Sequence, residues 1–313
     1  MTEKPLVSIL MPAFNAEKFI AEAIRSILDQ DHPNWELLIL NDASTDSTLS
    51  IINTFNDDRI RIFEQHENQG YLLSCNKLFE KVQGEFVTFL DADDTCATNR
   101  ISTCIAAFDE HLQLDFLTTD HIRTNGSGKL LSEHKVLVDY ERYASDPNYY
   151  PTICCATVFL RKQLLRQIGG YNPFFKEIGG EDYHWLFLLS RAGKGIHVTE
   201  SLYFYRTHAH QTHLLNTDPL KYFMQDIDQN MRTEIISGRQ PLSDSEAFRS
   251  KWNDKIRTES AELHLRRAAE ALNNRDFSTF FTQLFLGSFS WPLNLKNVKN
   301  GAYLGYSFLA RIA

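Results

Sequence analysis

The sequence lacks the glycine-rich signatures with which many nucleotide-binding folds hold phosphate groups. A dinucleotide-binding fold places G-x-G-x-x-G directly after its first strand, but the corresponding stretch here, residues 11–17, reads Met-Pro-Ala-Phe-Asn-Ala-Glu. No P-loop motif occurs in the 313 residues either. These absences exclude the two familiar ways of cradling phosphates with backbone amides, so a phosphate partner would need another kind of counter-charge.

Three further absences narrow the class of protein. No stretch reaches the roughly 18 consecutive apolar residues of a membrane-spanning helix, and the short apolar run near the N-terminus predicts a strand, not a signal peptide. The net charge is −8, whereas nucleic-acid-binding proteins usually have an excess of basic residues. We therefore expect no nucleic-acid partner. The five cysteines form no C-x-x-C pair, which favours reduced thiols and a cytoplasmic location.

The first ninety or so residues alternate between buried strands and amphipathic helices. Strands are expected at 6–11, 35–40, 60–63 and 86–90. Helices are expected at 17–30, 47–55 and 71–82. Crossovers long enough for helices predict an α/β fold with a doubly wound, mainly parallel sheet.

The pattern loosens after residue 94 and becomes purely helical from about residue 219. Before that change we expect helices at 101–111, 163–168 and 183–192. Strands are expected at 115–119, 154–160, 196–198 and 202–205. Residues 137–151 are expected to form a loop or lid. The helices expected after it are 220–237, 244–273, 276–287 and 297–311. We therefore divide the chain into a domain of residues 1–215 and a C-terminal all-helical extension, 216–313. The aromatic residues of 277–306 are expected to pack on the first domain or a partner subunit, as in a homo-oligomer, or to make a peripheral membrane contact.

Three carboxylates follow the strand expected at 86–90, within four positions: Asp91, Asp93 and Asp94. The carboxyl ends of parallel strands are where open α/β sheets bind ligands. Crowded carboxylates are costly without a cation, and hard oxygen ligands favour Mg²⁺ or Mn²⁺. The sequence therefore predicts a divalent metal at this edge, although an acidic turn that caps the next helix is the simpler alternative.

Four other residues are candidates for the same site. Asp42 ends the second strand and can accept a hydrogen bond from a nucleobase N–H, whereas Ser44 and Asp46 are better explained as turn and cap residues. Asp182 follows two glycines and opens a helix, whose N-terminus would keep it ionised and able to accept a proton. His208 is a candidate metal or phosphate ligand and Arg206 a candidate diphosphate partner; plain capping and surface roles remain the alternatives.

Five segments occur in an order that resembles the family 2 glycosyltransferases of the GT-A fold. They are residues 7–15 (Val-Ser-Ile-Leu-Met-Pro-Ala-Phe-Asn), 41–46 (Asn-Asp-Ala-Ser-Thr-Asp), 68–70 (Asn-Gln-Gly), 84–94 (Gly-Glu-Phe-Val-Thr-Phe-Leu-Asp-Ala-Asp-Asp) and 180–182 (Gly-Glu-Asp). The resemblance covers about residues 5–210. It implies an inverting transfer from a nucleotide-sugar, usually UDP-linked, with Mg²⁺ or Mn²⁺.

The resemblance also assigns roles to residues. It implies a nucleoside pocket lined by Pro12, Ala13, Phe14 and Asp42. By the same resemblance Asp91 approaches the ribose or the sugar, Asp93 binds the metal and Asp182 is the catalytic base. The expected partners are a UDP-sugar donor and a glycan or lipid-linked saccharide acceptor, which would place the protein in the cytoplasm or at the inner face of the cell membrane.

The chain departs from the family pattern after residue 70. Many relatives have Ala-Arg-Asn where this chain has Ser-Cys-Asn at 74–76. A basic residue is therefore missing near the donor, and we expect Arg100, Arg161 or Arg206 to replace its charge. A sugar-phosphate nucleotidylyltransferase and a non-catalytic nucleotide-sugar-binding protein remain as alternative functions.

Overall fold

The computed structural model describes residues 4–176, 178–208 and 224–239. One compact unit comprises Met1–Asn216 and Gln225–Gly238. The division of the chain near residue 215 stays a prediction, as do the helices expected after residue 240 and the role of the aromatic residues of 277–306, because those residues lie outside the described part. None of the described helices is both long and apolar enough to cross a membrane.

The first half of the sheet is parallel, as the sequence predicted. Its strands lie in the order β3-β2-β1-β4 and all pair in parallel. Their bounds are Val7–Ala13 (β1), Trp35–Asn41 (β2), Ile60–Glu64 (β3) and Phe86–Phe89 (β4). Every residue of β1, β2 and β4 is buried, which explains why these strands are continuous apolar runs in the sequence.

The second half makes the nine-stranded sheet mixed. Strand β8 runs antiparallel to both β4 and β6, while β9 runs parallel to β6 and antiparallel to β5. Strand β7 pairs antiparallel with β6. The bounds are Thr95–Cys96 (β5), Phe116–Asn125 (β6), Leu130–His134 (β7), Phe159–Arg161 (β8) and Gly195–Thr207 (β9). Parallel pairing thus dominates only the N-terminal half.

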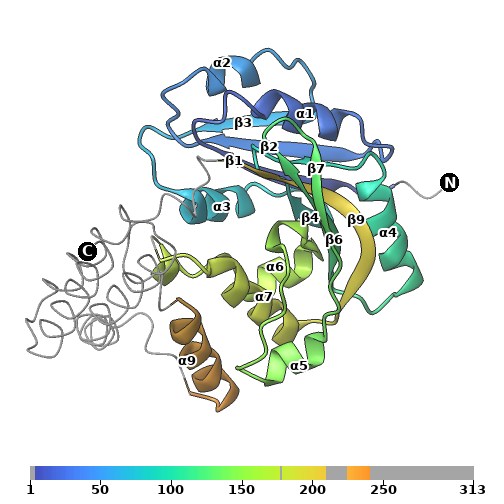
Figure 1. Ribbon diagram of the computed structural model, residues 1–313, viewed down its shortest axis with the longest axis vertical. Coiled ribbons are helices and arrows are strands. Elements are labelled where there is room, and N and C mark those ends of the chain that lie inside the picture. Colours follow the sequence, from blue (N-terminus) through green and yellow to red (C-terminus); the bar gives the residue numbers. More distant parts are fainter. Residues whose placement is uncertain (1–3, 177, 209–223, 240–313) are drawn as a thin grey trace, which may run out of the picture. The chain divides into compact units, whose positions relative to one another are not determined.

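Helices cover both faces of the sheet (Figure 1). One face carries α1 (Ile20–Leu28), α2 (Thr48–Ile52) and α4 (Arg100–Glu110), and the other carries α3 (Tyr71–Phe79), α6 (Lys162–Ile168) and α7 (Glu181–Ala192). On the α1 side, apolar side chains of α1 and α4 join those of β1, β2 and β4 in one buried core. On the α3 side, the rings of Phe79, Phe89, Tyr171 and Trp185 pack against one another. The site therefore stands on a sheet that is fixed from both sides.

Residues 137–151 were expected to form a loop or lid, and this is wrong in part. They contain α5 (Tyr140–Ser145), whose first turn is capped by Asp139, with the Asp139 carboxylate accepting a hydrogen bond from the backbone N–H of Arg142 at 2.9 Å. Two of its tyrosines, Tyr140 and Tyr143, are buried. The helix packs beside α7 (Figure 1), so this segment belongs to the packed structure.

Candidate active site

The loops that follow β1 and β2 are joined by hydrogen bonds. The backbone N–H of Asn15 donates to Ser44 Oγ at 3.1 Å, and the Asn15 side chain accepts from the backbone N–H of Thr45 at 2.8 Å. The Asp46 carboxylate accepts from the N–H groups of Glu17 and Thr48 at 3.2 and 2.9 Å. Ser44 and Asp46 therefore act as turn residues, as the sequence favoured, whereas the N-cap position of α2 is Ser47.

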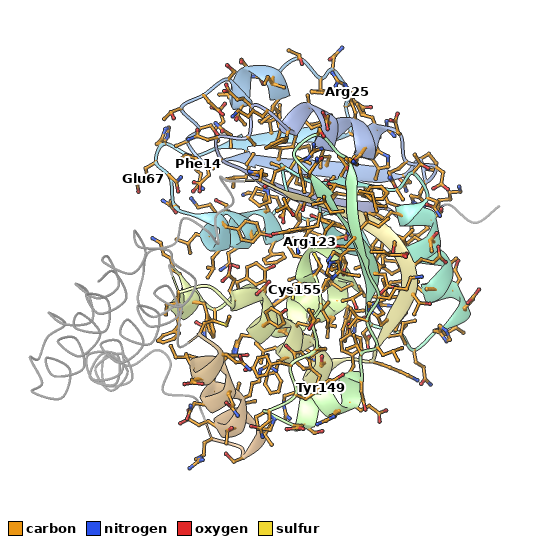
Figure 2. The ribbon with its side chains drawn as sticks, in the orientation of Figure 1. Phe14, Arg25, Glu67, Arg123, Tyr149 and Cys155 are labelled. Carbon is orange, nitrogen blue, oxygen red and sulfur yellow. The ribbon has the colours of Figure 1, made fainter. Side chains whose placement is uncertain are left out.

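The residues predicted to line a nucleoside pocket lie next to these joined loops. Pro12 and Ala13 are buried at the end of β1, in register with the last two residues of β2. The next residue, Phe14, is 47% exposed and is labelled near the edge of the sheet in Figure 2. The backbone N–H of Asp42 donates to the carbonyl of Ala13 at 2.8 Å. The structure thus brings Ala13 and Asp42 together at one edge, with Phe14 projecting from it.

Asp42 also anchors the segment that leads into α3. Its buried carboxylate accepts hydrogen bonds from Gln65 Nε2 at 2.7 Å, from the N–H of Gln69 at 2.9 Å and from the N–H of Gly70 at 2.8 Å. Gly70 has a φ of 88°, which favours glycine. Asp42 therefore shapes residues 65–70, a structural task that its position after β2 did not predict.

Asp94, the third carboxylate of the predicted metal edge, ties residues 91–94, the acidic segment, to β9. Its carboxylate accepts hydrogen bonds from the Tyr203 hydroxyl at 2.8 Å and from the backbone N–H of Arg206 at 2.6 Å. Burial, and next the charges of Asp93 and Asp91, raise the pKa of this carboxyl well above its usual range. Asp94 thereby holds the end of β9 against the loop after β4.

The two residues predicted as metal ligands lie side by side. His208 Nε2 is 2.9 Å from Asp93 Oδ2, and the His208 ring packs on Phe19 with 4.7 Å between ring centres. Among the residues described, no three histidine, cysteine or carboxylate side chains converge as a complete metal site. One carboxylate and one imidazole nevertheless suit a divalent cation whose remaining ligands are phosphate oxygens and water.

Arg206 contacts the backbone of Asp93, one member of this pair. Its Nε donates to the carbonyl of Asp93 at 2.8 Å, Nη1 to the carbonyl of Gly126 at 3.0 Å, and Nη2 to Glu22 at 2.6 Å. The side chain is buried and stacks on Phe19. A role in diphosphate binding stays a prediction, but these contacts favour a positioning role that joins α1, the acidic segment and the turn after β6.

The structure brings Asp91 and Asp182 to one cavity of about 460 Å³, although they lie far apart in the sequence. Asp91 Oδ1 accepts a hydrogen bond from the Tyr71 hydroxyl at 3.0 Å. Burial, followed by the nearby charge of Asp93, raises the pKa of Asp91 to about 7. The Asp91 carboxyl is therefore poised between its charged and neutral forms near neutral pH.

Asp182 is in the first turn of α7. The turn follows Gly180, which has a φ of 87°, and the backbone N–H of Tyr183 donates to Asp182 Oδ1 at 2.8 Å. Burial raises the pKa of Asp182, while this N–H and the Cys155 thiol, as hydrogen-bond donors, oppose the increase. Its neighbour Glu181 has a pKa raised to about 8, first by burial and then by the charge of Asp182. A partly buried carboxylate that opens into a cavity has the character of a general base.

Sequence reasoning missed a basic wall of the same cavity, made of His121, Arg123 and His134. No motif marks these residues, because β6 was expected to end at residue 119. Three arginines were expected to supply charge near the donor, and this stays a prediction. Arg100 donates to the carbonyl of Phe89 at 2.8 Å and Arg161 to that of Leu114 at 2.9 Å, whereas Arg206 contacts the acidic residues directly through the carbonyl of Asp93. In Figure 2, Arg123 and Cys155 lie close together between the sheet and helices α6 and α7.

A buried ionic cluster connects α7 to α9 (Met224–Ile236). The carboxylate of Asp228 lies 2.8 Å from His184 Nδ1 and 2.6 Å from Arg232 Nη2. It also accepts a hydrogen bond from the Tyr150 hydroxyl at 2.8 Å. His184 and Asp228 are almost fully buried. Because His184 stands one half-turn after Asp182, the cluster fixes the helix that presents the candidate base.

Comparison with known proteins identifies the family of the chain. Residues 8–169, slightly more than half of the chain, match the model for glycosyl transferase family 2. The UDP-Glc:alpha-D-GlcNAc-diphosphoundecaprenol beta-1,3-glucosyltransferase WfgD of Escherichia coli is 33% identical over 189 residues, which are 59% of this chain and 70% of that protein.

Solved structures share the fold. The S. aureus TarS 1-349 complex with UDP-GlcNAc has a TM-score of 0.60 at 19% identity. The match covers 96% of this chain and 80% of the TarS chain. The mannosyltransferase PcManGT of Pyrobaculum calidifontis, solved with GDP-Man and Mn²⁺, has a TM-score of 0.54 at 17% identity. The match covers 100% of this chain and 82% of that structure's chain. The architecture is therefore of the GT-A type expected from the sequence. From its family match, its relatives and its fold, the chain is a glycosyltransferase and belongs to family 2.

Proposed function

We propose that the protein transfers a sugar from a UDP-linked donor to a hydroxyl group of a lipid-linked saccharide, with inversion at the anomeric carbon. The observation that carries the proposal is the shared cavity of Asp91 and Asp182. Asp91 belongs to the acidic segment expected to hold the donor, and Asp182 stands at the start of α7, where it can face an incoming hydroxyl. The names of WfgD and of the TarS complex support a UDP-sugar, and the name of WfgD supports a lipid-linked acceptor.

Asp182 acts as the base in this proposal. Its carboxylate removes the proton from the acceptor hydroxyl as the hydroxyl oxygen attacks the anomeric carbon, and the nucleoside diphosphate departs from the opposite face. A single displacement inverts the configuration at that carbon. The N–H of Tyr183 holds Oδ1 of Asp182 in place, and Oδ2 is the oxygen that takes the proton in this proposal.

Asp93 and His208 are the residues that would hold Mn²⁺ or Mg²⁺. When bound, such an ion supplies positive charge to a departing diphosphate. Arg206 and Asp94 keep the two ligands together, since Arg206 donates to the Asp93 carbonyl and Asp94 accepts from the Arg206 N–H. The metal proposal is supported by this pair and by the Mn²⁺ with which the mannosyltransferase PcManGT was solved.

The two alternative functions have less support. A nucleotidylyltransferase would need a glycine-rich, basic loop after the first strand, and the family match now places the chain among glycosyltransferases. A non-catalytic binder would not need a carboxylate such as Asp182 that opens into the cavity. We further propose that the protein works at the inner face of the cell membrane, where a lipid-linked acceptor would be presented.

The test is product formation by the full chain. UDP-Glc, UDP-GlcNAc and GDP-Man are each incubated with Mn²⁺ and saccharide acceptors that carry a diphosphate-linked lipid, and products are identified by mass spectrometry. We expect transfer from a UDP-sugar, and Asp182→Asn should lower its rate by ~10²–10⁴-fold while UDP binding is retained. Asp109→Asn, an exposed residue of α4, is the matched control. Near wild-type transfer by Asp182→Asn would show that another group is the base.

A further inference from the structure

The cavity that holds Asp91 and Asp182 is lined by carboxylates from one set of elements and by an arginine and two histidines from another. The acidic wall comes from the loop after β4 and the start of α7, whereas His121 and Arg123 come from β6 and His134 from β7. The rings of His121 and His134 stack with 4.8 Å between their centres and 8° between their planes. Because the basic wall faces the same space as the candidate base, it lies where part of a substrate must pass.

Arg123 has unused hydrogen-bonding capacity in this cavity. Its Nη2 donates to Thr207 Oγ1 at 3.3 Å, and it forms no salt bridge with a carboxylate of the described residues. Its Nε is buried and has no hydrogen-bond partner within the described part of the chain. A buried guanidinium N–H without a partner is costly, which points to a partner that arrives with a ligand.

The two histidines add polar ring nitrogens to the lining of the cavity. Burial, and next the neighbouring His134, lower the pKa of His121 to about 4, so His121 is neutral near pH 7 and keeps one ring N–H. His134 Nε2 lies 2.8 Å from Ser132 Oγ, which leaves its other ring nitrogen available. One fixed positive charge and two polar rings suit an anion with several oxygen atoms.

This basic wall is separate from the pair expected to hold the donor diphosphate. Side chains alternate between the two faces of a strand. Arg206 points towards Phe19 at the start of α1, as does His208 just beyond the end of β9, whereas Tyr205 lines the cavity with Arg123. Neither Asp93 nor His208 lines the cavity. Arg123 shares the cavity with Asp182, so an anion beside Arg123 would lie in the space where the proposed acceptor hydroxyl arrives.

We propose that Arg123, assisted by His121 and His134, forms a subsite for a phosphate group of the acceptor, the diphosphate that joins the acceptor sugar to its lipid. The inference rests on the proposed function, because it takes Asp182 as the base that meets the acceptor. A diphosphate at the anomeric carbon of the acceptor lies within one sugar ring of the attacking hydroxyl. A contact to Arg123 would fix which hydroxyl reaches Asp182 and would select charged acceptors over neutral glycosides.

The experiment measures binding without donor or catalysis. Hexyl diphosphate is titrated calorimetrically into the full-length protein in buffer with EDTA, with hexyl glucoside as its neutral counterpart. The variants are Arg123→Gln and Arg123→Lys, and Arg25→Gln on exposed α1 is the matched control; Figure 2 labels Arg25 away from Arg123. UDP is titrated separately in the presence of Mn²⁺. Thermal unfolding of each variant confirms that it is folded.

We expect Arg123→Gln to weaken hexyl diphosphate binding by ~10- to 100-fold, the scale of charged hydrogen bonds. Arg123→Lys should recover part of the loss, and Arg25→Gln should match the wild type. UDP affinity with Mn²⁺ should stay within about twofold. Unchanged hexyl diphosphate binding by a folded Arg123→Gln would overturn the subsite, and a loss confined to UDP would reassign Arg123 to the donor. A failure of sugar transfer alone would count against the proposed function and leave this binding result standing.

Discussion

His184 Nδ1 lies 2.8 Å from Asp228 Oδ1 and joins the helix of the candidate base to α9. The contact is enclosed by Arg232 and by the Tyr150 hydroxyl. It links residues 44 positions apart. The orientation of the first turn of α7 is therefore set partly from a helix that the sequence placed in the C-terminal extension.

Asp228→Asn should reduce both stability and transfer. The change leaves Arg232 without a buried counter-charge, and breaking a buried ion pair by removing one partner costs about 3–5 kcal/mol. We expect a lower free energy of unfolding in urea and, at a temperature where the variant is folded, a lower kcat with little change in UDP affinity. Asp226→Asn, two residues away and exposed, serves as the control. Equal kcat in a folded Asp228→Asn would confine the cluster to a structural role.

Removal of either predicted metal ligand should abolish metal-dependent donor binding. Asp93→Ala and His208→Ala each take one of two adjacent donors from the cation, so the gain in UDP affinity on adding Mn²⁺ should disappear in calorimetry. UDP binding in EDTA should be similar in wild type and variants. Asp58→Ala, an exposed aspartate before β3, is the matched control. A persistent Mn²⁺ effect in both variants would remove these residues from the metal site.

Stability should decrease as pH increases through the range in which Glu181 titrates. The folded state raises the pKa of this carboxyl from 4.5 to about 8, so the folded protein binds its proton more tightly than the unfolded chain does. The contribution is full below about pH 4.5 and is lost as pH rises towards 8. Glu181→Gln should remove this part of the slope.

The measurement is urea unfolding of wild type and Glu181→Gln at pH 5, 6.5 and 8, in EDTA. We expect the stability of the variant, relative to wild type, to increase with pH. Glu80→Gln, an exposed glutamate at the end of α3, should show a constant difference. A constant difference for Glu181→Gln as well would mean that this carboxyl titrates normally.

The rate of transfer should increase with pH along its acidic limb. Asp182 must be ionised to accept a proton, and burial raises its pKa above the ordinary value. The midpoint of the limb in kcat/KM should therefore lie above about 4, the usual aspartate range. Steady-state kinetics from pH 4.5 to 8.5 with a saturating metal give this profile. Rates that stay flat down to pH 4.5 would mean that the essential base has an unperturbed pKa.

The parallel half of the fold was predictable because burial on both faces leaves a continuous apolar run in β1, β2 and β4. Strand β9 shows where this signal fails. Thr199 and Glu200 are exposed in the middle of the strand, and its pairing with β6 shifts register near Asp120. The apolar pattern is interrupted there, so one long strand was expected as two short ones.

The residues of the candidate site likewise fall into those that the sequence predicted and those that it did not. Asp91, Asp93 and Asp182 were predictable because each is an acid at the end of a strand or at the start of a helix. The basic wall was not, because Arg123 reaches the cavity only through the long β6–β9 pairing and His134 only through the turn between β6 and β7. The role of Arg206 in the site stays a prediction, and its contacts with Asp93, Gly126 and Glu22 join segments that no local pattern connects.

The joined loops after β1 and β2 restrict which sequences can keep the conformation at this edge of the sheet. Asn15 and Ala43 both have positive φ, of 49° and 56°, a conformation that asparagine and glycine tolerate and that β-branched residues avoid. Natural variation at these positions should therefore be limited to glycine, asparagine, aspartate and small residues such as alanine. A sequence with valine or isoleucine at position 15 or 43 would need a different loop, and its donor preference could not be inferred from the remaining motifs.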